Sequence, residues 1–142
     1  MTAHDVRRQF IWHGIFVFGL GLLVGAFVPV LTNPRMGVAA HVGATLSGMF
    51  LVLVGLVWEE IRLSAAAEKA AYWLFLYATY TGWLGKFLAG LWGTSGATPI
   101  GGAGYRVEPW QEIAVYVVTG SFSLAIAVAC ILTLWGLRKA RA

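Results

Sequence analysis

The chain has 142 residues, of which 59% are hydrophobic and only 11% are charged. A soluble domain carries about a quarter charged residues, so this composition excludes an ordinary soluble protein and predicts an integral-membrane one. The net charge of +4 does not indicate nucleic-acid binding, because the basic residues lie in short segments that flank apolar stretches, where they act as topology signals.

Four apolar stretches are long enough to cross a bilayer, which takes roughly 20 residues each. They lie near residues 10–31, 38–61, 71–93 and 113–137. We therefore predict an all-α fold, an integral-membrane four-helix bundle that forms one domain over residues 1–142. The single cysteine, Cys130, lies in the last stretch and indicates neither a disulfide framework nor a thiolate metal cluster.

The basic residues gather on one side of the predicted membrane. The two terminal flanks and the connection between the second and third stretches carry Arg7, Arg8, Arg62, Lys69, Arg138, Lys139 and Arg141. The other two connections carry one arginine each, Arg35 and Arg106. By the positive-inside rule, we expect both termini in the cytoplasm of a multi-pass protein in the bacterial inner membrane.

The shorter connections carry turn and cap signals. LTNPRMG at 31–37 predicts a tight external turn, because Asn-Pro disfavours helix at its first residue and Gly37 frees the exit. LSAAAEK at 63–69 offers Ser64 as the N-cap of the third helix.

The longest connection, residues 93–112, is rich in glycine and is bounded by Trp92 and Trp110. A loop of this length in a compact domain is usually functional or disordered, and tryptophans at its ends suit anchoring at the membrane interface. We predict an ordered external loop that caps the bundle.

Small residues recur four apart on the first two stretches, in the pairs Gly21/Gly25, Ala40/Ala44 and Gly43/Ser47. Each pair lies on one helix face, where it allows close helix packing within or between subunits. A bundle of this size has little lipid-shielded interior of its own, so we expect a homo-oligomer.

Three ionisable side chains stand out inside the predicted spans, where such groups are costly and are candidates for function. His13 lies about one turn from the cytoplasmic end and His41 about one turn from the external end, roughly 20 Å apart along the bilayer normal. This separation argues against one haem held by both. Lys86 lies near the depth of His41. Structural alternatives stay open, since His41 could only bridge helices and Lys86 could reach the surface through its long stem.

Ser47 and Thr81 are expected one to two turns deeper, at similar heights to each other, and Tyr116 enters the same layer from the fourth span. We therefore predict a polar layer in the outer half of the bundle, beneath the glycine-rich loop. Depth and composition do not name its chemistry.

Several unusual segments together resemble the hydroxylaminobenzene mutase family over almost the whole chain. They are HG at 13–14, NPRMGVAAH and SGMFLVLVGLVW between 33 and 58, YATYTGWL at 77–84, LWGTSGATPIGGAG at 91–104, PWQE at 109–112 and LWGLR at 134–138. More distantly, AAHVGATLSGM and TGWLG resemble the styrene oxide isomerases, which are also small four-span proteins.

The resemblance implies a cofactor and an activity. Styrene oxide isomerases bind ferric haem b through one histidine, assemble as trimers and use the iron as a Lewis acid. Their histidine matches His41, which implies that His41 is the metal ligand, with Ala44, Gly48 and Trp83 beside the haem. It also implies an isomerase or mutase that rearranges small aromatic N-hydroxylamines or aryl epoxides without net redox change.

For catalysis, the expected residues are Ser47, Thr81, Lys86 and Tyr116. The sequence departs from the family where Ser47 and Gly82 replace asparagines and where Lys86 replaces a neutral residue. A lost amide partner can change substrate preference strongly. Two other classes remain as alternatives: a haem-binding redox or sensor protein similar to cytochrome b, and a metal-free membrane scaffold or transporter.

Overall fold

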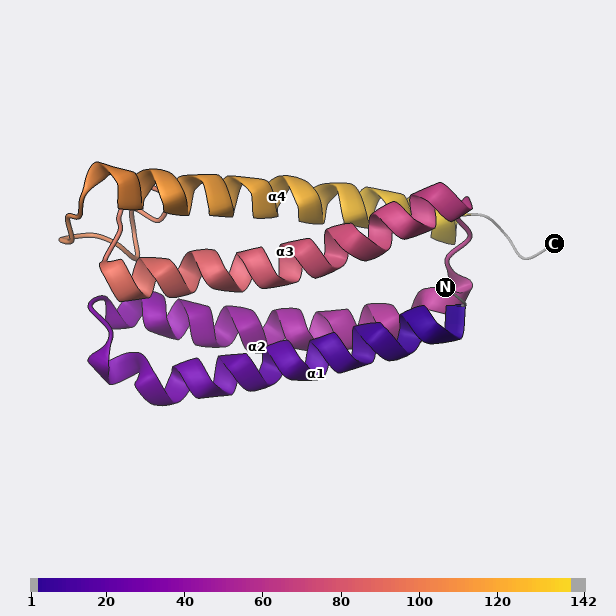
Figure 1. The fold of residues 1–142 in the computed structure, drawn as a ribbon, viewed down its shortest axis with the longest axis horizontal. Coiled ribbons are helices and arrows are strands. Elements are labelled where there is room, and N and C mark those ends of the chain that lie inside the picture. The colour runs from indigo at the N-terminus through magenta and orange to yellow at the C-terminus, as the bar shows by residue number, and fades with distance from the viewer. Residues whose placement is uncertain (1–2, 139–142) are drawn as a thin grey trace.

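The computed structural model describes residues 3–138, which form four long helices and, within that range, no strand. The helices are α1 (Ala3–Phe27), α2 (Pro34–Val57), α3 (Ala65–Trp92) and α4 (Pro109–Leu137). Two short 3-10 turns, η1 (Val28–Val30) and η2 (Trp58–Glu60), follow α1 and α2. The helices lie side by side along the long axis of the molecule (Figure 1). The predicted all-α class is confirmed.

Each predicted span coincides with one helix, but three of the four meet the length and hydropathy expected of a membrane-crossing helix. These segments are His4–Val30, Pro34–Glu60 and Pro109–Leu137. The interior of α3 is more polar, because it contains Lys86 together with threonines, tyrosines and glycines. Figure 1 shows α3 alongside α2 and α4 over most of their length. That α3 also crosses the membrane, and that both termini are cytoplasmic, remain predictions. Of the predicted topology signals, Lys139 and Arg141 lie outside the described residues.

The helices pack as two antiparallel pairs, α1 with α2 and α3 with α4, joined by contact between α2 and α3. The larger apolar core lies at the end where α1 begins and α2 ends. There the Phe10 ring is completely buried, with ring centroids 4.8 Å from Trp58, 5.1 Å from Tyr72 and 6.0 Å from Phe75. This aromatic cluster joins the two helix pairs.

The turn before α2 differs from the prediction in one respect. Asn33 caps α2 through its side-chain oxygen, which accepts a hydrogen bond from the Met36 backbone N–H at 3.3 Å. Pro34 then begins the helix, a position where its missing N–H costs nothing. The prediction that Gly37 provides the exit from the turn was wrong, because Gly37 is already helical and buried. The predicted N-cap Ser64 is confirmed, with its hydroxyl accepting from the Ala67 N–H at 3.4 Å.

The loop between α3 and α4, residues 93–108, is held at several points, in agreement with the predicted order. Gly93 ends α3 in the left-handed region at φ 83°, where glycine is favoured over other residues. The Glu112 carboxylate accepts hydrogen bonds from the backbone N–H groups of Ser95 and Gly96, each at 2.8 Å. Asn33 donates from Nδ2 to the Gly101 carbonyl at 2.9 Å. The loop is thus tied to the first turns of both α2 and α4.

Candidate functional site

His41 lies on the face of α2 that packs against α1. Its Nδ1 is 2.8 Å from the Gly21 carbonyl oxygen. A carbonyl only accepts, so Nδ1 carries the proton, and in a neutral imidazole Nε2 then has a free lone pair. Among the described residues, Nε2 has no hydrogen-bond partner. His41 is therefore held in one tautomer, with its second nitrogen available to a ligand.

Gly25 provides the space that the His41 ring occupies. A Cβ atom at Gly25 would lie 2.6 Å from Nδ1 of His41 and 3.0 Å from its Cε1. The predicted small pair Gly21/Gly25 thus packs within one chain. Gly21 supplies the carbonyl that accepts the His41 hydrogen bond, and Gly25 leaves space for the His41 ring. Together they form a cradle for the imidazole on α1.

His13 occupies a separate place in the bundle. Its Nδ1 lies 2.7 Å from the Tyr80 hydroxyl, which joins α1 to α3. Along α1, His13 and Gly21 are about 12 Å apart at a rise of ~1.5 Å per residue. The two imidazoles therefore hold different partners at different levels. Within residues 3–138, no group of three or more His, Cys, Asp or Glu side chains could hold a metal ion.

Lys86 turns inward along α3. Its Nζ donates to the Gly82 carbonyl at 3.0 Å and lies 5.1 Å from the centroid of the Phe122 ring. The stem crosses α2 at Gly43, where a Cβ would lie 3.1 Å from Cδ of the lysine. The lysine side chain runs back along α3 toward Gly82, away from the end of the helix at Trp92. It therefore does not extend toward that end.

A groove between α2, α3 and α4 lies beside this lysine. It encloses about 220 Å³ and is lined by Leu46, Ser47, Phe50, Thr79, Phe122 and Ile126. Phe122, whose ring meets the lysine ammonium, therefore also forms a wall of the groove. We call this the Ser47 groove. Of the predicted catalytic residues, Ser47 lines the groove, and Lys86 contacts its Phe122 wall.

The other two predicted catalytic residues bond elsewhere. The Thr81 hydroxyl donates to the Tyr77 carbonyl of its own helix at 2.7 Å. The Tyr116 hydroxyl donates to the Gly96 carbonyl at 2.7 Å, and the exposed ring packs against the loop. The structure therefore gives both side chains structural partners, and their catalytic roles stay predictions.

The three other residues expected beside a haem have different surroundings: Ala44 and Gly48 pack against α1, whereas Trp83 lies on α3. Ala44 is completely buried against Gly21, and a Cβ at Gly48 would lie 2.5 Å from the Gly14 carbonyl oxygen. In a single chain, α1 covers both positions. Trp83 differs, because its indole Nε1 is buried without a hydrogen-bond partner among the described residues while its ring stacks on Phe87 at 5.4 Å.

His41 and the Ser47 groove lie on opposite sides of α2. Residues 41 and 43 are about 200° apart around a helix of 3.6 residues per turn. The first contacts α1, whereas the second contacts Lys86 of α3. The single polar layer expected from the sequence is therefore two sites within one chain, separated by α2.

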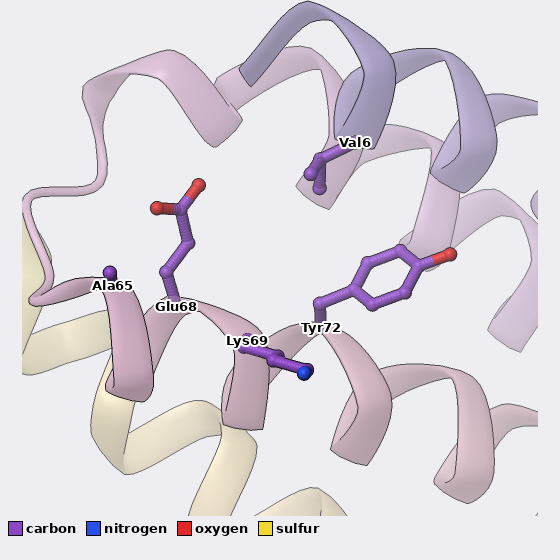
Figure 2. A pocket seen from close by; sticks show the side chains of 5 residues that line it. All are labelled: Val6, Ala65, Glu68, Lys69 and Tyr72. Atoms are coloured by element: carbon purple, nitrogen blue, oxygen red, sulfur yellow. The ribbon is translucent and has the colours of Figure 1, made fainter. Parts of the chain in front are cut away.

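A larger cavity, about 280 Å³, lies at the opposite end of the bundle from the loop. Figure 2 shows Val6 from α1 facing Ala65, Glu68, Lys69 and Tyr72 from the start of α3. None of the predicted site residues lines it. Glu68 accepts from the Trp58 indole N–H at 3.2 Å, and the Tyr72 hydroxyl bonds to Gln9. These contacts join α3 to η2 and α1, so the polar residues around this cavity have a structural role.

Thr79, Phe122 and Tyr80 are site residues that the sequence reading missed. A signal for Thr79 exists, because Thr79, Gly82 and Lys86 recur at the i, i+3, i+7 spacing of one helix face. Phe122 gives no such signal, since its place depends on how α4 is aligned against α3. Tyr80 is one of three tyrosines on α3, and its pairing with His13 requires the α1–α3 contact.

Comparisons of the sequence with known proteins show which family the chain belongs to. The sequence profile of the styrene oxide isomerase family matches residues 6–138. The chain is 42% identical over 142 residues to the hydroxylaminobenzene mutase HabB of Ectopseudomonas oleovorans, covering 99% of this chain and 87% of that protein. It is 40% identical over 127 residues to hydroxylaminobenzene mutase HabA of the same organism, covering 89% of this chain and 94% of that one.

No solved structure matches the chain significantly. The profile nevertheless covers nearly the whole chain, and both relatives are similar over most of their own length. The expected resemblance is confirmed, as is the expected class of enzyme. The chain belongs to the styrene oxide isomerase family and is an isomerase or mutase.

Proposed function

We propose that the protein is a haem b-dependent membrane isomerase of small aromatic compounds. Its reaction would be the conversion of hydroxylaminobenzene to 2-aminophenol, or of an aryl epoxide to an aldehyde. The relatives named hydroxylaminobenzene mutase support the first substrate class, and the family profile supports the second. In the proposal, the enzyme acts in the bacterial inner membrane with both termini in the cytoplasm.

The observation that carries the haem assignment is the hydrogen bond from His41 to Gly21. Metal-ligating histidines usually donate their other ring N–H to a carboxylate or a backbone carbonyl, which fixes the tautomer and orients the ring. His41 has this arrangement, and its Nε2 has no protein partner among the described residues. A haem needs one such axial ligand, so the donor set fits the group. When bound, ferric haem would supply a Lewis acid that withdraws electron density from the substrate oxygen.

The chain's own residues have positioning roles in this proposal. Gly21 and Gly25 keep the imidazole ring in place, and Ala44 and Gly48 keep α1 close to α2 behind it. Within one chain, a single ligand cannot contact both His41 and the Ser47 groove, because α2 lies between them. The homotrimer implied by the resemblance is therefore part of the proposal, since a neighbouring chain could present its groove to the His41 face.

The test is an anaerobic assay on detergent-purified protein without NADH. We expect hydroxylaminobenzene to yield 2-aminophenol, or styrene oxide to yield phenylacetaldehyde, as measured by chromatography. His41→Ala should abolish the reaction, whereas His13→Ala should retain it because His13 binds Tyr80 elsewhere. A folded wild-type protein that leaves both compounds unchanged would refute the proposed activity. Equal rates for wild type and His41→Ala would refute the role of His41.

A further inference from the structure

The ammonium group of Lys86 is incompletely satisfied by the chain that surrounds it. An ammonium has three N–H donors, and here one carbonyl and one aromatic ring face it. Within residues 3–138, its side chain has no carboxylate partner. Cations at membrane depth are expensive unless they are paired. The arrangement therefore calls for an anion that the described chain does not supply.

Hydroxyl groups in the neighbouring groove also have free donors. Ser47 and Thr79 line the groove, and neither hydroxyl has a hydrogen-bond partner among the described residues. Other hydroxyls of these helices behave differently and donate to carbonyls of their own helix. Examples are Thr45, Thr81, Ser121, Ser123 and Thr133. The Ser47 groove thus presents donors to a guest that accepts hydrogen bonds.

The walls of the groove indicate the rest of the guest. Phe50 and Phe122 stand on α2 and α4, and Leu46 and Ile126 complete an apolar lining. Gly82 makes room for the Phe122 ring, since a Cβ there would lie 2.8 Å from two ring carbons. At about 220 Å³, the groove is smaller than the ~300–1,000 Å³ typical of pockets for drug-sized ligands. It therefore suits a single ring, which aromatic side chains bind through offset or edge contacts.

We propose that the Ser47 groove binds a single-ring aromatic acid, with its ring between Phe50 and Phe122 and its carboxylate facing the Lys86 ammonium and the free hydroxyls. The carboxylate supplies the missing anion and accepts the unused hydrogen bonds. Charge-assisted hydrogen bonds of this kind are roughly twice as strong as neutral ones. This inference needs no haem, because its residues belong to one chain whose own His41 lies on the other side of α2. In the trimer of the proposed function, the same groove would face the His41 of a neighbouring chain.

The experiment measures benzoate binding to the full-length protein in a non-ionic detergent by calorimetric titration. Benzamide, which has the same ring but no charge, is the neutral probe, and decanoate tests an acyl-chain acid. We expect wild type to bind benzoate at least tenfold more tightly than benzamide or decanoate, which corresponds to about 1.4 kcal/mol. Lys86→Met should remove this preference, and Lys86→Arg should keep most of it. Lys69→Met is the matched control, since Lys69 is exposed at the other end of α3.

Equal binding of benzoate and benzamide by wild type, or no binding of either, would overturn the proposal without any variant. Tighter binding of decanoate than of benzoate would overturn the assignment of an aromatic guest. Benzoate binding by a folded Lys86→Met protein at wild-type strength would overturn the role of the lysine. If Lys86→Met does not fold, Ser47→Ala replaces it, and an unchanged preference for benzoate would then contradict the role of the groove.

Discussion

Gly25→Ala tests the cradle that holds His41. An alanine Cβ at this position would lie 2.6 Å from Nδ1, about 0.8 Å inside the 3.4 Å at which ordinary contact begins. The imidazole must therefore move away from α1, and its 2.8 Å hydrogen bond to Gly21 must lengthen or break. The backbone of α1 on the other side of the contact is helical and cannot retreat without disturbing its own hydrogen bonds.

The magnitudes decide which property to measure. A lost hydrogen bond costs about 0.5–1.5 kcal/mol, whereas alanine in place of a helical glycine gains about 0.8–1 kcal/mol. The free energy of unfolding should thus change little, because the two effects nearly cancel. Loss of an outer partner of a metal-ligating histidine, in contrast, typically weakens metal binding 10- to 100-fold. Haem affinity is therefore the sensitive readout.

The assay is a titration of haem-free protein with ferric haem in detergent, followed by Soret absorption. We expect Gly25→Ala to bind 10- to 100-fold more weakly than wild type. Gly19→Ala is the matched control on the same helix, because a Cβ at Gly19 meets nothing within 4 Å, and it should bind haem like wild type. If Gly25→Ala and Gly19→Ala bind haem equally well, the cradle does not orient a haem ligand.

Three further substitutions test the fold around the sites. Phe10→Ala should lower the free energy of unfolding by about 3–5 kcal/mol, because its completely buried ring contacts three other rings; a thermal shift no larger than that of an exposed residue such as Phe16→Ala would contradict this. Glu112→Ala should cost about 1.5–3 kcal/mol and expose residues 93–108 to protease, since its carboxylate holds two backbone N–H groups; an unchanged cleavage rate would count against the clamp. Tyr80→Phe should lower the free energy of unfolding by about 0.5–1.5 kcal/mol through the lost hydrogen bond to His13, and it should leave haem affinity unchanged. Weakened haem binding would show that the two histidine sites are coupled.

The sequence was sufficient to predict four helices, the Ser64 cap and an ordered loop. These depend on local signals, namely long apolar runs, a capping hydroxyl and flanking tryptophans, which are readable without tertiary structure. The turn at 31–37 shows the limit of that reading. Asn33 and Pro34 begin the helix at once, so Gly37 is needed for packing against η1, Leu31 and Gly90 of α3 rather than for the turn.

The site was predicted less well, because the sequence allows an estimate of depth along each span but not of direction around each helix. Ser47, Lys86, Thr81 and Tyr116 have different neighbours in the structure. A helix turns by about 100° per residue, so residues 41 and 43 face opposite sides. Which side meets α1 and which meets α3 depends on packing between helices, which no single-span pattern encodes.

The most direct test of the central claim is the absorption spectrum of wild-type and His41→Ala protein, purified in detergent and reconstituted with ferric haem. The proposal predicts a Soret band in wild type and in His13→Ala, and its loss in His41→Ala at the same protein concentration. A folded wild-type protein that stays colourless, or a His41→Ala protein with an unchanged Soret band, would contradict it.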